Sequence, residues 1–206
     1  VGQHAGVLED YGCVASGWLA LALATADPAW LTAAGDLLEV ALTRFRADDG
    51  GFFDTADDAE ALVARPRDPG DNASPSGLSS VIHALTTYAA VTASDRHRLA
   101  AEEALATVAG LAERAPRFAG WSMAAAAAHV AGPEEIAVVG PAGPARDALA
   151  AAARRRAAAV VVVADGPVPG IPLLDGRGPV DGLPAAYVCR HHVCAAPVTE
   201  ASALAG

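Results

Sequence analysis

Basic residues are scarce in this sequence, which has 14 lysines and arginines against 24 acidic residues and a net charge of −10. A chain this acidic is a poor partner for a phosphate backbone, so we predict no nucleic-acid binding. Long hydrophobic runs are also missing. The apolar run from Val160 to Val163 is far shorter than the roughly 18 residues of a membrane span. We therefore predict no association with a membrane.

Cysteine is scarce too, which bears on both compartment and fold. The three cysteines, Cys13, Cys189 and Cys194, are too few and too scattered for a disulfide scaffold. The first residues show neither the basic nor the apolar region of a secretory signal, so we expect a cytoplasmic protein. Hydrophobic residues, in contrast, make up 53% of the chain and charged residues 18%, a balance typical of a packed globular protein.

Helical periodicity dominates the first two thirds of the sequence. Apolar residues at three-and-four spacing predict helices over 9–24, from 28 to the turn at 49–51, from 76, from 95 and over 120–130. The first four helices pair as two hairpins with matching positions, because Asp27 corresponds to Asp95 and Leu31 to Leu99. Repeated hairpins bury their apolar faces by stacking, as an open solenoid or closed into a ring. We expect antiparallel hairpins whose first, third and fifth helices are parallel, within a longer array.

The sequence pattern changes near residue 133. Short apolar runs at 136–139 and 159–163 flank a helical stretch at 146–156, which predicts a strand–helix–strand unit with parallel strands. A last strand is expected at 185–189, and Thr199 is expected to cap a terminal helical turn. The predicted fold is mainly α: a partial α/α toroid of helical hairpins over 1–132, then a small α/β strand–helix–strand unit over 133–206 of the same domain.

The stretch GGFFDTADDAEALVARPRDPGDNASPSG, residues 50–77, has neither helical period nor strand alternation. A loop this long in a compact domain is usually functional or disordered, and its two phenylalanines argue against a plain linker. Ordering such a loop costs much backbone entropy, so polar contacts must hold it in place. We expect Asp54, Arg65 and Asn72 to share one hydrogen-bonded network, with Phe52 or Phe53 buried beneath the loop.

This loop, the segment LEDYG at 8–12 and the segment VDGLPAAYVCRHHVCAAPVT at 180–199 together resemble one known family. It is the spermatogenesis-associated, thioredoxin-like-domain-containing protein family. Residues 8–204 of this sequence resemble the C-terminal part of the proteins of that family. Gly12 and Cys13 depart from the bulkier residues expected after LEDY. The resemblance implies an α/α toroid similar to six-hairpin glycosidases and sugar epimerases. It also implies that the chain is a fragment lacking a thioredoxin-like domain and the first hairpins.

Parallel first, third and fifth helices bring their N-termini to one end of the molecule, where the long loop also lies. Free helix amides, carboxylates and aromatic rings at that rim suit a sugar-like small molecule. The competing interpretation treats the acidic residues and serines as helix caps and the arginines as partners of loop acids. The ligand-binding candidates at the rim are Glu9, Asp10, Tyr11, Asp54, Arg65, Asn72, Ser74, Ser76 and Trp121.

Two further patterns carry weaker signals. Cys189 and Cys194 lack the second ligand pair of a zinc knuckle and the spacing of a reactive pair, so two thiols in a turn are favoured over a redox or metal site. The glycine-rich turn at 140–144 resembles a dinucleotide fingerprint, but its prolines remove amide donors. We therefore predict no cofactor, no bound nucleotide and no metal.

Two functions from different classes fit these observations. The first is an enzyme, or former enzyme, of the α/α-toroid type that binds or acts on a sugar-like small molecule. The second is a non-catalytic scaffold or interaction module for the N-terminal thioredoxin-like domain. The sequence singles out no catalytic residue, because glycosidase-type hydrolysis needs two carboxyl groups at a set separation.

Overall fold

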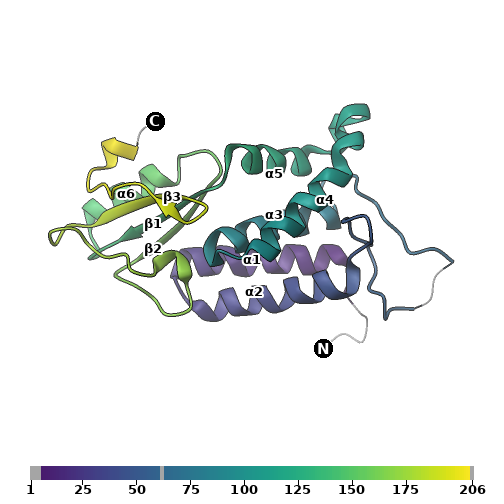
Figure 1. Cartoon of the computed structure of the whole chain (residues 1–206), viewed down its shortest axis with the longest axis horizontal. Coiled ribbons are helices and arrows are strands. Elements are labelled where there is room, and N and C mark those ends of the chain that lie inside the picture. Colours follow the sequence, from purple (N-terminus) through teal and green to yellow (C-terminus); the bar gives the residue numbers. More distant parts are fainter. Residues whose placement is uncertain (1–5, 61–62, 205–206) are drawn as a thin grey trace.

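The computed structural model describes residues 6–60 and 63–204, and the first two thirds of the chain are mainly helical (Figure 1). The helices are α1 (Leu8–Thr25), α2 (Pro28–Val40), α3 (Gly77–Thr92), α4 (Asp95–Arg114) and α5 (Gly120–Ala131). These are the five helices that the apolar spacing predicts. None of the helices in the described residues is long and apolar enough to cross a membrane.

Local capping explains where the second and third helices begin. The Asp27 side chain accepts a hydrogen bond from the amide of Ala29 at 2.9 Å, and Pro28 occupies the first turn of α2. The Ser76 hydroxyl accepts a hydrogen bond from the amide of Ser79 at 3.1 Å and so caps α3. Both starts were predicted from the sequence and are confirmed.

The end of α2 differs from the prediction. The α-helix stops at Val40, and a π-helical turn, η1 (Ala41–Phe45), follows in place of α-helix up to Asp49. The wider turn buries Phe45 completely. Phe45 then lies 5.1 Å, centroid to centroid, from the ring of Tyr11 on α1. Aromatic packing therefore fixes the end of α2 against the start of α1.

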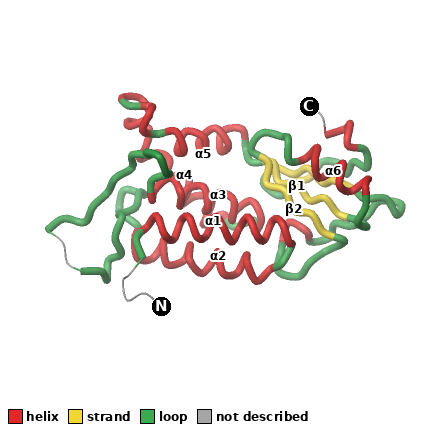
Figure 2. Tube along the Cα trace, turned by 180° about the vertical axis from the view of Figure 1, so that it is seen from behind, coloured by secondary structure: helices red, strands yellow, loops and turns green. Residues whose placement is uncertain are grey.

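The first, third and fifth helices run in the same direction, as predicted. α1 packs along the length of α3, and α1–α2 and α3–α4 are antiparallel hairpins (Figures 1 and 2). The close approach of α1 to α3 depends on Gly12, because a Cβ atom there would lie 2.8 Å from the backbone nitrogen of Val81. The N-termini of α1, α3 and α5 consequently meet at one end of the molecule, beside the long loop (Figure 2).

A small mixed sheet lies at the opposite end of the helices (Figure 1). Its strands, in the order β2-β1-β3-β4, are β2 (Ala159–Ala164), β1 (Glu134–Val139), β3 (Ala185–Arg190) and β4 (Val193–Cys194). β1 and β2 are parallel and joined by α6 (Pro144–Ala153), which confirms the strand–helix–strand unit. β3 pairs with β1 in the antiparallel direction. Two short turns, η3 (Pro172–Leu174) and η4 (Ala201–Leu204), complete this region.

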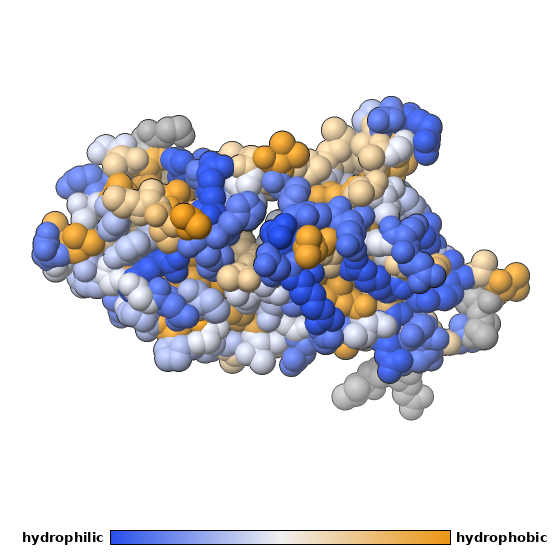
Figure 3. Space-filling model, in the orientation of Figure 1, coloured by the Kyte–Doolittle hydropathy of each residue, from blue (hydrophilic) through white to orange (hydrophobic). Residues whose placement is uncertain are grey.

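Alternating side chains of β1 serve two hydrophobic cores. Ala137 and Val139 join the core formed by α1, α3 and their partner helices, whereas Ile136 and Val138 pack with Leu149 of α6 on the other face. The sheet therefore shares a core with the helical hairpins. On the surface, hydrophilic side chains cover much of the face seen in Figure 3, and apolar residues form separate patches.

Candidate functional site

A buried aspartate connects the N-termini of α3 and α5. One carboxylate oxygen of Asp71 accepts hydrogen bonds from the amide of Ser76 at 3.0 Å and the hydroxyl of Ser79 at 2.6 Å. The other oxygen accepts from the amides of Trp121 at 2.8 Å and Ser122 at 3.3 Å. The side chain satisfies helix amides that lack intrahelical partners, and its charge favours the positive ends of both helix dipoles.

Asp71 is the hub that sequence reasoning missed. Asn72 was expected to join a network with Asp54 and Arg65, but its backbone amide donates a hydrogen bond to the carbonyl of Ser74 at 3.0 Å. The network expected among Asp54, Arg65 and Asn72 is therefore wrong in its membership. A local signal was present in the sequence, since an acidic residue lies a few positions before the serine cap of α3. Its long-range partners on α5 carry no such signal.

The backbone of the loop holds the start of α1. The Leu8 amide donates to the Asp54 carbonyl at 2.9 Å, and the Asp54 amide donates to the carbonyl of Pro66, also at 2.9 Å. The Asp54 carboxylate accepts from the Asp68 amide at 2.9 Å. Burial raises the pKa of Asp54, although the hydrogen bond from the Asp68 amide opposes that shift. The backbone of Asp54 therefore holds the start of α1, and its carboxyl group ionises less readily than usual.

The two loop arginines bind different kinds of partner. Arg65 was expected to pair with a loop carboxylate, but it donates to the backbone carbonyls of Arg44, at 3.1 Å, and Thr55. Its guanidinium also lies 4.0 Å from the centroid of the Phe53 ring. Arg67 instead makes two bonds of 2.9 Å to the carboxylate of Asp49.

The phenylalanine under the loop is Phe52. Its side chain is 2% exposed and belongs to the main core, whereas Phe53 is half-buried beneath Arg65. The expectation that one of the two rings anchors the loop is confirmed. Burying one phenylalanine recovers only roughly 2–3 kcal/mol, so the polar contacts of the described part of the loop remain necessary to order it.

A cavity of about 320 Å³ opens where the loop meets the starts of α1 and α3. Residues from three segments form its wall. They are Val7, Glu9, Asp54, Thr55, Pro66, Asp68, Gly70, Asn72, Ser74, Pro75, Ser76 and Gly77. Five of the predicted rim residues therefore surround one cavity: Glu9, Asp54, Asn72, Ser74 and Ser76.

The other predicted rim residues lie outside that wall. Asp10 caps α1, because its carboxylate accepts from the amide of Val7 at 3.0 Å. The Tyr11 ring packs on Phe45, and Arg65 is bound to loop carbonyls. Trp121 is 56% exposed on α5, away from the cavity lining. Asp10 is therefore a helix cap, as the competing interpretation predicts. Ser76 is both a helix cap and part of the cavity wall.

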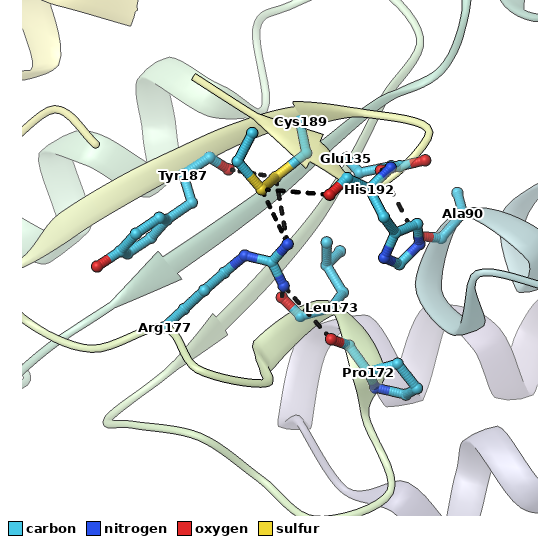
Figure 4. Close-up of a disulfide and its surroundings, with 9 residues drawn as sticks. Ala90, Glu135, Pro172, Leu173, Arg177, Tyr187, Cys189 and His192 are labelled. Atoms are coloured by element: carbon cyan, nitrogen blue, oxygen red, sulfur yellow. Dashed lines mark hydrogen bonds and ion pairs between the residues drawn. A yellow bond between two sulfur atoms is a disulfide. The ribbon is translucent and has the colours of Figure 1, made fainter. Parts of the chain in front are cut away.

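The expectation of two free thiols in the β3–β4 turn is wrong. Cys189 and Cys194 face each other across the two strands and form a disulfide. Figure 4 shows the buried guanidinium of Arg177 directed at both sulfur atoms. The short strand β4 that carries Cys194 has too few residues for a sequence pattern, so the cross-strand pairing was not predictable from periodicity. The remaining cysteine, Cys13, is free and exposed on α1.

The glycine-rich turn before α6 is occupied by an arginine of the chain itself. Arg146 donates to the carbonyl of Gly140 at 3.0 Å and forms an ion pair with Asp165 beyond β2. A Cβ atom at Gly140 would lie 2.6 Å from the Cα of Pro184, so this glycine serves close backbone packing. Among residues 6–60 and 63–204, no group of three or more histidine, cysteine or acidic residues could hold a metal ion.

A second cavity, of about 170 Å³, lies between the ends of the helices and the sheet. Its polar wall includes His129, His191, His192, Glu135 and Arg98. The His192 ring nitrogen lies 3.0 Å from the carbonyl oxygen of Ala90. The backbone amide of His192 donates to the Glu135 carboxylate at 2.6 Å. This cavity therefore borders the disulfide hairpin, not the rim.

The comparisons with known proteins assign no family to the chain: no family model matches it, and no curated protein matches it. The rim cavity, where the loop meets the starts of α1 and α3, brings together five of the nine predicted binding residues.

Proposed function

We propose that the rim cavity binds a small polyhydroxylated, sugar-like molecule. The observation that carries this proposal is the gathering of Glu9, Asp54, Asn72 and Ser74 around one cavity of about 320 Å³. That volume is at the lower end of the roughly 300–1,000 Å³ of small-molecule sites, which fits a ligand of one sugar ring.

The polar groups of the wall match a polyol chemically. The Glu9 and Asp54 carboxylates can accept hydrogen bonds from hydroxyl groups, and the exposed Asn72 and Ser74 side chains can both donate and accept. Pro66 and Val7 supply apolar surface for the C–H face of a ring. Among the described residues, the wall contains no arginine or lysine, so an anionic ligand is disfavoured.

We also propose that the helical hairpins belong to an α/α toroid, within the C-terminal part of a protein of the thioredoxin-like-domain-containing family. An unusual feature of α1 supports this. Val14 is 44% exposed and Leu21 41% exposed, and a Cβ atom at Gly17 would have no described residue within 4 Å. A helix that is apolar on every side is normally buried, so a neighbouring hairpin stacked on this face would complete its packing.

The same exposed face of α1 supports the alternative, a non-catalytic scaffold for a thioredoxin-like domain. In that case the domain, and not another hairpin, covers Val14 and Leu21. A structure of the longer protein distinguishes the two, because one places a helical hairpin against α1 and the other places a thioredoxin-like domain there.

The binding proposal is tested by isothermal titration calorimetry and ligand-observed NMR with a panel of neutral mono- and disaccharides. We expect millimolar or tighter binding by at least one monosaccharide, weakened about tenfold by Asn72→Ala and by Glu9→Gln. The matched control is Glu200→Gln, an exposed glutamate outside the cavity wall. Absence of binding by the whole panel, or equal weakening by Glu200→Gln, contradicts the proposal.

A further inference from the structure

The Cys189–Cys194 disulfide closes a hairpin with an unusual turn. The two cysteines are opposed across β3 and β4, and only Arg190, His191, His192 and Val193 lie between them. Both histidines have left-handed backbones, with φ of 49° and 59°. Asparagine and glycine normally occupy such turn positions, and a positive φ strains the backbone of the two histidines. The disulfide and the Glu135–His192 hydrogen bond hold this turn in place.

Arg177 places a positive charge beside the two sulfur atoms (Figure 4). Its guanidinium donates to the Sγ of Cys194 at 2.9 Å and to the Sγ of Cys189 at 3.4 Å. The residue is only 8% exposed, and its other hydrogen bonds go to the carbonyls of Pro172 and Leu173. A disulfide is uncharged and a weak acceptor, so these contacts neutralise little of the buried charge.

Arg177 forms no direct ion pair with the acidic side chains near it among the described residues. None of the ion pairs among the described residues includes Arg177. Burial lowers its pKa, and the fields of Glu135, Asp175 and Tyr187 oppose that shift. Glu135 instead accepts a hydrogen bond from the amide of His192 at 2.6 Å. A thiolate at either sulfur would supply the missing anionic partner, and a neighbouring guanidinium is what stabilises a thiolate.

The two sulfurs differ in access. Cys189 is 1% exposed within β3, whereas Cys194 is only partly buried at the end of β4. An incoming thiolate therefore reaches Cys194 first.

We propose that Cys189 and Cys194 form a redox-active pair that undergoes thiol–disulfide exchange with an external dithiol. A thiolate of the dithiol bonds to the Cys194 sulfur as the Cys189–Cys194 bond breaks, and the electron pair stays on Cys189 as a thiolate beside Arg177. The second thiolate of the dithiol then attacks the dithiol's first sulfur, which is bonded to Cys194 in the mixed disulfide. The bond to Cys194 breaks, and Cys194 is released as a thiolate. The dithiol loses two electrons and two protons, and the cysteine pair gains both.

The experiment is redox titration of the folded protein in a Cys13→Ser background, which removes the free, exposed thiol. The protein is equilibrated in buffers of reduced and oxidised dithiothreitol, and the remaining thiols are counted by maleimide labelling and mass spectrometry. We expect a reversible two-electron transition while the circular dichroism of the fold is retained. A pair that is reduced only after denaturant is added is a structural cross-link, and that result overturns the proposal.

The role of Arg177 has its own matched comparison. We expect Arg177→Met to lower the equilibrium constant for reduction roughly tenfold, a shift of about 30 mV to more negative potential. Arg190→Met is the control, because Arg190 adjoins Cys189 in the sequence but binds Glu134 and the Ala131 carbonyl. Equal shifts in the two variants contradict the assignment of Arg177.

A kinetic measurement covers the case in which Arg177→Met does not fold. The rate of iodoacetamide alkylation of the reduced protein, followed against pH, reports the pKa of the accessible thiol. We expect a thiol pKa below the ordinary value of about 8.5 because of the guanidinium. A thiol pKa at or above that value contradicts the proposal.

Discussion

The Asp71 carboxylate binds the backbone amide of Trp121 at 2.8 Å, although the two residues are 50 positions apart in the sequence. The same side chain holds the amide of Ser76 at the start of α3. One carboxylate therefore fixes α5 relative to α3, and it forms the inner support of the rim. The exposed residues Asn72 and Ser74 lie one and three positions after Asp71 in the chain. The position of the cavity wall therefore depends on this buried carboxylate.

Removing this support should destabilise the fold. We expect Asp71→Ala to lower the free energy of unfolding by about 3 kcal/mol, because several buried donors lose a charged acceptor. Urea denaturation followed by circular dichroism measures the change. The control is Asp68→Ala, since Asp68 is exposed and its carboxylate bonds only to the nearby amide of Gly70 among the described contacts. Similar losses in both variants would show that Asp71 is not the hub.

The two phenylalanines of the loop should respond differently to truncation. We expect Phe52→Ala to cost about 3–5 kcal/mol, because the ring is 2% exposed in the main core. Phe53→Ala should cost about 1–2 kcal/mol, since the ring is half-buried and stacked under Arg65. Chemical denaturation of each variant provides the comparison. Equal costs would mean that the core does not anchor the loop through Phe52.

The loss of stability on acidification should depend on Glu134. Its carboxylate binds Arg156 at 2.5 and 2.9 Å and Arg190 at 3.0 Å, and the bond to Arg156 is the main cause of a pKa below the ordinary 4.5. A lowered pKa means that the contribution is complete above about pH 4.5 and is lost as the pH falls through the folded-state pKa. Glu134→Gln should therefore cost about 2 kcal/mol at neutral pH and little at a pH below the folded-state pKa, where Glu134 is protonated in the wild type as well.

The control for this pH dependence is Glu39→Gln. Glu39 also pairs with an arginine, Arg96, but both side chains are largely exposed. Exposed pairs contribute about 0–1 kcal/mol, so this variant should show a small loss at either pH. A pH-independent loss in Glu134→Gln would attribute the effect to packing and not to the carboxylate charge.

The parts of this structure that could be predicted are those with local causes. The Asp27-Pro28 cap, the apolar spacing of the helices and the strand pair around α6 all follow from neighbouring residues, and the structure has them. The bonds from Asp71 to α5, from Arg65 to the Arg44 carbonyl and between Cys189 and Cys194 depend on how distant segments approach. A single sequence holds no periodic record of such contacts, so the rim was located correctly while its supporting groups were not.

Two glycines of α1 should have opposite effects when replaced by alanine. Gly12 faces α3, where a Cβ atom would lie 2.8 Å from the Val81 nitrogen and would collide with the Ser80 hydroxyl. A Cβ atom at Gly17 would meet no atom within 4 Å in the part of the chain that the structure describes. Gly12→Ala should destabilise the protein by about 1–3 kcal/mol, because two packed backbones must separate. Gly17→Ala should stabilise it by about 1 kcal/mol, since alanine has the higher helix propensity. Thermal and urea unfolding of both variants measure the pair. A neutral Gly12→Ala would show that α1 and α3 can move apart freely, and the shared rim at their N-termini would then lack a fixed geometry.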